Sequence, residues 1–207
     1  MITLWRFRQL EAALHLRGYG PIIEWSETIV RPVNAEEFAD RAIYVICNSG
    51  MRVTVAEPIY RRCMEAMMTG ASAATVFGHP GKAAAIDSIW AKREQLFASY
   101  LAADDQISFL ESLPWIGPIT SRHLFKNLGA DEAKPDVHLE RLAGRCRTTV
   151  ARLCSRLARQ TGYRVATIDT ILWRACADGV LDSRRYEQEG WNSAVSPALS
   201  RIALPEA

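Results

Sequence analysis

Hydrophobic and polar positions follow a helical period along almost the whole chain. Strong helix formers dominate, strict alternation of apolar and polar residues is scarce, and glycine or proline interrupts the pattern at intervals of roughly 15 to 25 residues. This pattern predicts an all-α fold. The expected helices span residues 3–17, 35–47, 52–69, 81–101, 105–113, 118–128, 137–144, 148–161 and 164–178.

Local signals mark several ends of these helices. Asn34 and Glu37 have the spacing of a capping box, in which each side chain accepts a backbone N–H of the other residue. Gly129 and Gly162 follow apolar runs and predict C-terminal stops. Residues 182–207 show no sustained helical period, so we expect an irregular tail that covers the surface.

Length and composition indicate a folded helical protein. The chain has 207 residues, of which 49% are hydrophobic, which is ample for a buried core and argues against disorder. That length suits one domain, or two small lobes that share a cleft. We treat residues 1–207 as a single domain in which the middle helices bury one apolar set and the terminal helices bury another.

The net charge of +2 does not by itself indicate a nucleic-acid binder, but the charges are distributed unevenly. Seven arginines lie between Arg141 and Arg164, and Glu140 is the one acid beside them. A basic face of this kind suits contacts with phosphate groups. For any single arginine, a solvated helix face is an equally good explanation.

The five cysteines form no CxxC pair and no even, closely spaced framework. The four histidines also lack the spacing of metal ligands. We therefore expect no iron–sulfur cluster, no structural zinc and no other metal. Mostly buried, reduced thiols fit a reducing cytoplasm. We expect neither a signal peptide nor a membrane span, so the predicted location is the cytoplasm.

Two motifs stand close together in the centre of the chain. The run Leu113-Pro114-Trp115-Ile116-Gly117-Pro118-Ile119-Thr120 reads as a tight turn between two helices, with its last glycine at the exit. Such a turn leaves the backbone N–H groups of residues 116–120 unpaired at a helix N-terminus, where they can hold a phosphate. Downstream, Asp136 comes directly before a helical run and can cap that helix.

Together these motifs resemble the helix-hairpin-helix and catalytic aspartate of the DNA glycosylase superfamily, specifically over residues 105–145. The resemblance implies a two-lobed helical fold in which the hairpin grips the DNA backbone and the aspartate acts on a base flipped out of the duplex. It assigns catalysis to Asp136. It assigns DNA contacts to Trp115, Ile116, Gly117, Ile119, Thr120, Arg122 and Lys126.

The chain departs from the family pattern at two hairpin positions. Trp115 stands where a glycine is common, and its ring is expected either to pack beneath the loop or to stack on a sugar. Ile119 occupies the position at which bifunctional members carry the lysine that attacks the sugar. Isoleucine cannot form a Schiff base, so a glycosylase/lyase mechanism is rejected.

Other polar positions are candidates for a base pocket or an anion contact. In residues 46–52, Asn48 and Ser49 replace the serine and glutamine that many glycosylases carry, and the amide of Asn48 is suited to pair with a pyrimidine edge. A kinked helix with locally satisfied polar groups is the alternative. Lys82 follows a Gly/Pro loop and is a candidate anion ligand, or part of a plain turn. The remaining base-pocket candidates are Arg52, His138 and Asp169. For Asp169, an internal salt bridge to an arginine is the favoured alternative.

Two enzymatic functions and one binding function fit these features. The chain resembles the phage thymidine-hypermodification branch of the superfamily, whose transferases join an amino acid amine to the methylene of a phosphorylated 5-hydroxymethyluracil in DNA. The alternative is a monofunctional glycosylase, and the third is a DNA-binding module without catalysis. The transferase would take double-stranded DNA and a free amino acid or other amine as partners. We expect no cofactor, no membrane contact and a monomer, placed in the host cytoplasm if phage-encoded.

Overall fold

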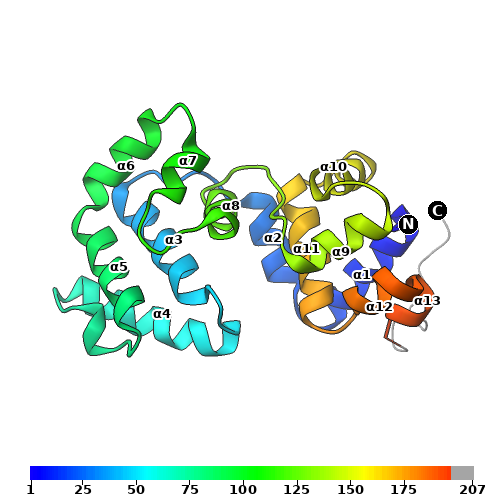
Figure 1. Cartoon of the computed structure of the whole chain (residues 1–207), viewed down its shortest axis with the longest axis horizontal. Coiled ribbons are helices and arrows are strands. Elements are labelled where there is room, and N and C mark those ends of the chain that lie inside the picture. Colours follow the sequence, from blue (N-terminus) through cyan, green and yellow to red (C-terminus); the bar gives the residue numbers. More distant parts are fainter. Residues whose placement is uncertain (197–207) are drawn as a thin grey trace. The chain divides into compact units, whose positions relative to one another are not determined.

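The computed structural model describes residues 1–196, which form helices joined by turns (Figure 1). No strand forms in that range, although Leu181 and Val195 make an isolated antiparallel bridge. The expected all-α fold is confirmed. The elements are α1 (Leu4–Leu16), α2 (Gly20–Thr28), α3 (Ala35–Asn48), α4 (Val53–Met68), the short 3-10 helix η1 (Ala73–Thr75), α5 (Pro80–Ala91), α6 (Arg93–Ala102), α7 (Gln106–Glu111), α8 (Pro118–Asn127), α9 (Val137–Arg145), α10 (Val150–Thr161), α11 (Val165–Ala177), α12 (Ser183–Glu189) and α13 (Trp191–Ala194).

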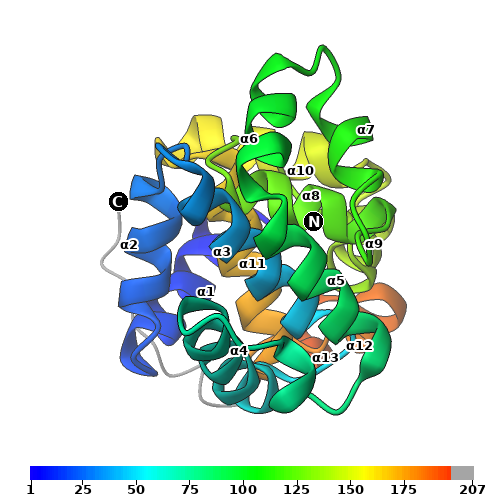
Figure 2. The same ribbon diagram turned by 90° about the vertical axis from the view of Figure 1, so that its left-hand side faces the viewer.

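Contacts divide the chain into two compact units. Unit 1 comprises Met1–Ile29 and the chain from Asp131 onward, and unit 2 comprises Val30–Ala130. In unit 1, α11 is the central helix and packs against α1, α2, α9 and α10 (Figure 1). In unit 2, α3 is central and packs against α4, α5, α6 and α8 (Figure 2).

Each unit buries its own hydrophobic core. The core of unit 2 draws on residues 38–128, and that of unit 1 on residues 2–23 and 139–194. This is the expected division into one apolar set from the middle helices and another from the terminal helices. The central helix α11 is buried on several faces, as is typical of a helix enclosed by others.

Two helix boundaries differ from the expectation. The chain turns at Gly18, whose φ is +83°, and then forms α2, which the sequence pattern did not predict. Pro21 in the first turn of α2 suits a helix start because its missing N–H would have no intrahelical partner there. The single helix expected over residues 81–101 is broken at Lys92, which ends α5 and begins α6.

The expectation of an irregular tail over residues 182–207 is wrong for its first part. The side chain of Asp182 accepts two backbone N–H groups of the following turn and so starts α12. Tyr186 and Trp191 are buried in the core of unit 1, and α12 packs against α9. These two aromatic residues give the segment enough apolar surface to fold onto the unit. Residues 197–207 lie outside the described part of the chain.

The expected helix ends are largely confirmed. Asn34 Oδ1 accepts the N–H of Glu37 at 2.8 Å, whereas the Glu37 side chain accepts the N–H of Val33 and not that of Asn34. Gly162 ends α10 with a φ of +80°, and Gly129 follows α8 with a φ of +92°. Both glycines adopt the left-handed backbone that disfavours other residues.

Gly129→Ala is expected to destabilise the protein more than Gly70→Ala. A Cβ at Gly129 would lie 2.8 Å from the backbone N of Arg31, whereas a Cβ at Gly70 meets no atom within 4 Å. Both glycines have positive φ, so each substitution carries left-handed strain of about 1 kcal/mol. Overlap with backbone adds about 1–3 kcal/mol for Gly129→Ala alone. Urea unfolding of the two variants checks this difference, and equal losses would contradict it.

Candidate functional site

The predicted tight turn between two helices is present in unit 2, where it joins α7 to α8; from here on, hairpin means α7, this turn and α8. Asp105 caps α7 by accepting the N–H of Ser108 at 3.0 Å, and Pro118 opens α8. The two helices pack against each other, and the Ser121 hydroxyl lies 3.2 Å from Glu111 Oε1. Proline and glycine in the turn therefore set a short helix–turn–helix unit, as the sequence predicted.

The turn offers fewer open donors than expected. The Ile116 N–H donates to Leu113 O at 3.1 Å, and the Gly117 N–H donates to Thr120 Oγ1 at 2.7 Å. The expectation that the N–H groups of Ile116 and Gly117 are unpaired is therefore wrong. Ile119 and Thr120 lie in the first turn of α8, where backbone N–H groups have no intrahelical acceptor. Their N–H groups are the ones left to meet a phosphate.

Trp115 at the hairpin tip packs against the start of α5. Its φ is +66°, a left-handed conformation that costs a non-glycine residue on the order of 1 kcal/mol and accounts for glycine being the expected residue there. The ring meets His79 edge to face, with centroids 4.9 Å apart. It also covers Gly81, where a Cβ would lie 2.6 Å from the ring. The packing interpretation of Trp115 is confirmed, although the side chain is still 45% exposed.

Lys82 has a different role from the predicted anion contact. The residue is 4% exposed, and its Nζ donates to Ser49 O at 2.6 Å and Cys47 O at 3.3 Å. These carbonyls lie at the C-terminal end of α3, where a cation is favoured by the helix dipole. Burial lowers the pKa of Lys82. The ammonium group therefore ties α5 to the end of α3, and the anion-binding assignment is withdrawn.

The polar groups of the 46–52 segment are satisfied locally. Asn48 Nδ2 donates to Tyr44 O at 2.9 Å, and the Ser49 hydroxyl donates to Ile46 O at 3.0 Å. This is the alternative that the sequence left open beside a base pocket. Arg52 is exposed immediately before α4.

Three segments singled out in the sequence thus meet in unit 2. We call their contact the Trp115 cluster and define it as Trp115, His79, Gly81, Lys82 and Ser49. His79 begins α5 and accepts the Lys82 N–H at 3.3 Å, so one turn of α5 contacts the hairpin tip through two residues and the end of α3 through a third. The cluster fixes the hairpin tip against the central helix of its unit.

The two hairpin cations that were predicted to contact DNA, Arg122 and Lys126, are both on α8. Lys126 is only 9% exposed, and Arg122 is half-buried. The prediction that Lys126 reaches DNA phosphates is therefore not supported by its burial. Ile119, by contrast, is 55% exposed beside the open end of α8.

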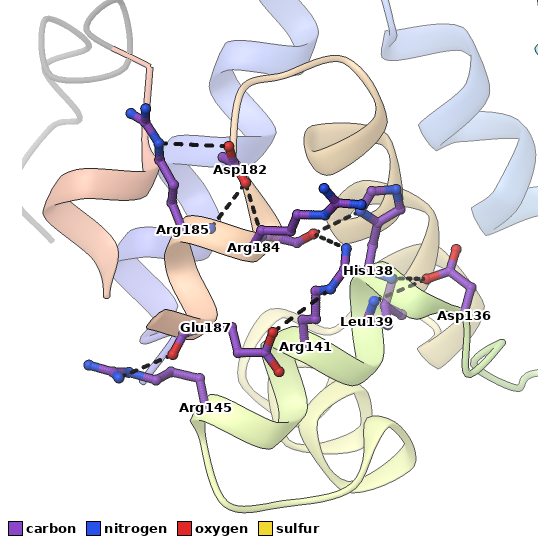
Figure 3. Close-up of polar contacts among 10 residues, drawn as sticks. Asp136, His138, Leu139, Arg141, Arg145, Asp182, Arg184, Arg185 and Glu187 are labelled. Atoms are coloured by element: carbon purple, nitrogen blue, oxygen red, sulfur yellow. Dashed lines mark hydrogen bonds and ion pairs between the residues drawn. The ribbon is translucent and has the colours of Figure 1, made fainter. Parts of the chain in front are cut away.

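Asp136 lies in unit 1 and begins α9. Its Oδ1 accepts the backbone N–H groups of His138 and Leu139, both at 3.0 Å, as Figure 3 shows. The residue is 9% exposed. Its negative charge is placed at the positive end of the α9 dipole. The predicted helix cap is confirmed, and it uses one of the two carboxylate oxygens.

The second oxygen of Asp136 faces a lysine that the sequence analysis did not single out. Lys134 Nζ lies 3.8 Å from Asp136 Oδ2 and 5.6 Å from the centroid of the Trp173 ring. The Lys134 backbone N–H donates to Asp169 Oδ1 at 2.9 Å, so one residue contacts both predicted carboxylates. The sequence signal that could have identified Lys134 is the Lys-Pro-Asp spacing. The Asp136 N–H donates to Lys134 O at 2.9 Å, which closes a three-residue turn and brings the two side chains together.

His138 and Asp169 take structural partners in unit 1. His138 Nδ1 lies 2.9 Å from the Ser183 hydroxyl, so its ring ties α9 to α12. The assignment of His138 to a base pocket is therefore not supported. Asp169 is 1% exposed and holds the backbone before α9. Burial and the charge of Asp136 raise the pKa of Cys176 to about 12.

Residues 1–196 contain no group of three or more side chains arranged to hold a metal ion. None of the helices in this range has the length and apolar character that crossing a membrane requires. No family model matches the chain, and no curated protein or solved structure matches it either.

Proposed function

We propose that this protein is a DNA-binding enzyme that acts on a base turned out of the duplex, with Asp136 as the acting carboxylate. The observation that carries the proposal is that Asp136 is buried and yet keeps one carboxylate oxygen outside its helix cap, next to a lysine. Oδ1 is fully used as a helix cap, whereas Oδ2 takes no part in capping and faces Lys134. A plain cap, worth about 1 kcal/mol, needs neither the lysine nor the burial.

The hairpin supplies the DNA contact in this proposal. The N–H groups of Ile119 and Thr120 and the dipole of α8 favour a backbone phosphate at the hairpin tip. Trp115 and Ile119 place exposed apolar surface beside it, which suits contact with sugars. Such contacts position a duplex without reading its sequence.

The reaction we propose is transfer of an amine to a thymine-derived base. The amine nitrogen forms a bond to the exocyclic methylene of a phosphorylated 5-hydroxymethyluracil, and the methylene–oxygen bond to phosphate or pyrophosphate breaks. Asp136 accepts the proton that the amine loses. Lys82 is committed to backbone carbonyls, so it is not assigned to the leaving anion.

A monofunctional glycosylase is the second candidate, and one observation favours it. Asn48 and Ser49 satisfy their polar groups within α3, so they give no separate evidence for a remodelled base pocket. An ion-paired carboxylate also suits stabilisation of the positive charge that develops on a sugar when its base departs. Water would then be the nucleophile.

Product analysis decides between these reactions. Duplex DNA with 5-phosphomethyl- or 5-pyrophosphomethyl-uracil is incubated with the protein and amino acids, digested to nucleosides and analysed by mass spectrometry. Transfer is expected to give a heavier nucleoside with an intact glycosidic bond and released phosphate or pyrophosphate, only when amine is present. If free base and alkali-labile sites form without added amine, the protein is a glycosylase and the transfer proposal fails. If the DNA is unchanged in every reaction, both enzymatic proposals fail and a DNA-binding module without catalysis is the remaining candidate.

Gly117→Ala is expected to weaken DNA binding about tenfold, or about 1.4 kcal/mol, without loss of folding. A Cβ at Gly117 meets only Thr120 Oγ1, at 4.0 Å, so the hairpin tolerates it. The added methyl group instead occupies the face where backbone must approach a phosphate. Fluorescence anisotropy with a labelled duplex measures the change. Gly144→Ala in α9, whose Cβ meets nothing within 4 Å, is the control; equal affinities for both variants would remove the hairpin from the interface.

A further inference from the structure

Unit 1 carries a hollow of about 530 Å³ on the outer face of α10, separate from Asp136. We call it the α10 groove. Arg152, Arg156 and Arg159 line it together with the hydroxyl-bearing Thr148 and Ser155. No aspartate or glutamate is among its lining residues.

The sequence of α10 produces this surface directly. Val150, Leu153, Cys154 and Leu157 are buried in the core of unit 1, which turns the opposite face of the helix outward. On that outward face the arginines fall at intervals of four and three residues. A helix rises 1.5 Å per residue, so the row extends over about 10 Å. Because α10 contains no acidic residue, the i,i+4 ion pairs that commonly neutralise such a row cannot form within the helix.

The arginines of the groove differ from other arginines of unit 1. On α9, Arg145 donates to Glu187 O at 3.2 Å, and Arg141 lies 3.8 Å from a Glu187 oxygen, so both serve to attach α12 (Figure 3). Among the described residues, no carboxylate pairs with Arg152 or Arg159. Arg156 gives one donor, Nη2, to Ile2 O at 2.7 Å and keeps others on its guanidinium group.

We propose that the α10 groove binds phosphate groups, and that its ligand is a single strand of nucleic acid. Guanidinium groups match phosphate oxygens with two parallel hydrogen bonds, and the two hydroxyls add neutral donors. Three cations in a row of about 10 Å fit consecutive phosphates of one strand better than a single free phosphate. A solvated helix face would need neither the hollow nor the absence of acids. The choice of nucleic acid as the source of the phosphate rests on the proposed function. The inference that the groove binds phosphate does not depend on that function.

The first test compares two charge-matched double variants. Arg152→Gln/Arg159→Gln removes two cations from the groove, and Arg184→Gln/Arg185→Gln removes two exposed cations from α12 in the same unit. Binding of fluorescein-labelled dT12 is measured by anisotropy from 50 to 200 mM salt. Each lost phosphate contact lowers the slope of log K against log salt by about 0.7 on single strands, so the groove variant should lose about 1.4. A groove variant that behaves like the α12 variant overturns the proposal.

Cys146 provides a local readout. It is partly exposed and lines the groove, whereas the other four cysteines are buried. Saturating dT12 should slow alkylation of Cys146 by N-ethylmaleimide several-fold in the wild type and not in Arg152→Gln/Arg159→Gln, with the adduct located by mass spectrometry. Protection by pyrophosphate or dTMP but not by dT12 would overturn the strand as ligand and assign a small phosphorylated molecule instead. No protection by any of these probes would overturn the phosphate site.

This design separates the groove from the proposed function. If DNA bases remain unmodified in the product assay but dT12 still protects Cys146, the groove proposal stands and the enzymatic one fails. If bases are modified and Cys146 is never protected, the reverse holds. Gly117→Ala serves as a third arm, because it should weaken duplex binding and leave the protection of Cys146 by dT12 unchanged.

Discussion

Asp136→Asn is expected to lower turnover by about 10²- to 10⁴-fold, the range that a positioned acid or base supplies, while DNA affinity is retained or rises. Asparagine keeps the Oδ1 acceptor for the N–H groups of His138 and Leu139, so the start of α9 is preserved. The substitution removes the negative charge and places an amide NH₂ where Oδ2 faces Lys134. Loss of a carboxylate also removes repulsion of phosphates. Rates are measured as modified nucleoside or released base per unit time.

Asp182→Asn is the matched control for this prediction. Asp182 also begins a helix of unit 1: its Oδ1 accepts the N–H groups of Arg184 and Arg185, and its Oδ2 lies 4.0 Å from Arg185 Nε (Figure 3). The two aspartates therefore share a cap and a basic neighbour, and differ in burial: Asp136 is buried and Asp182 is exposed. Equal losses in both variants would show that helix capping, and not chemistry, explains Asp136. Full activity of Asp136→Asn would also end the catalytic assignment.

Much of the hairpin and the Asp136 cap was predictable because their causes are local. Pro118 and Gly117 mark the start of α8 within two residues, and Asp136 is followed at once by the N–H groups that it accepts. A carboxylate or proline at a helix start acts on its own turn, so reading it requires no knowledge of the rest of the fold. The same holds for Asn34 and the start of α3.

The roles of Trp115 and Lys82 could not be read in the same way, because they depend on residues distant in sequence. Trp115 packs on His79 and Gly81, more than 30 residues earlier in the numbering, and Lys82 donates to carbonyls of α3. A lysine after a Gly/Pro loop looks like an anion ligand until the helix end that it caps is known. Only the packing of α5 against α3 decides which partner the ammonium group meets.

The C-terminal segment illustrates a related limit. Its helices are short, with seven residues in α12 and four in α13, too few to show a clear period. Isolated helices of this length are not stable in water, so tertiary contacts must hold them. Tyr186 and Trp191 provide those contacts, with ring centroids 6.4 Å apart in an edge-to-face arrangement.

Tyr186→Ala is therefore expected to destabilise unit 1 by about 3–5 kcal/mol, the usual cost of removing a fully buried aromatic ring. Tyr186 is 1% exposed, and its ring lies in the core that also holds α9 and α11. Its loss leaves a cavity and removes the main anchor of α12 against α9. Urea unfolding followed by circular dichroism measures the change in free energy.

Tyr186→Phe separates the ring from its hydroxyl. The Tyr186 hydroxyl lies 3.5 Å from Cys146 Sγ, a weak contact, and burial raises the pKa of this tyrosine. Phenylalanine keeps the ring and removes a buried polar group whose one hydrogen-bond partner within residues 1–196 is a thiol, so the expected loss is below about 1 kcal/mol. A large loss in both variants would place the stability in the hydroxyl contact. A segment this short keeps its helices only where burial of its aromatic rings outweighs the entropy of ordering it. If Tyr186→Ala also costs less than about 1 kcal/mol, that burial is not stabilising the segment. In that case α12 does not belong to the folded core, and the expectation of an irregular tail is restored.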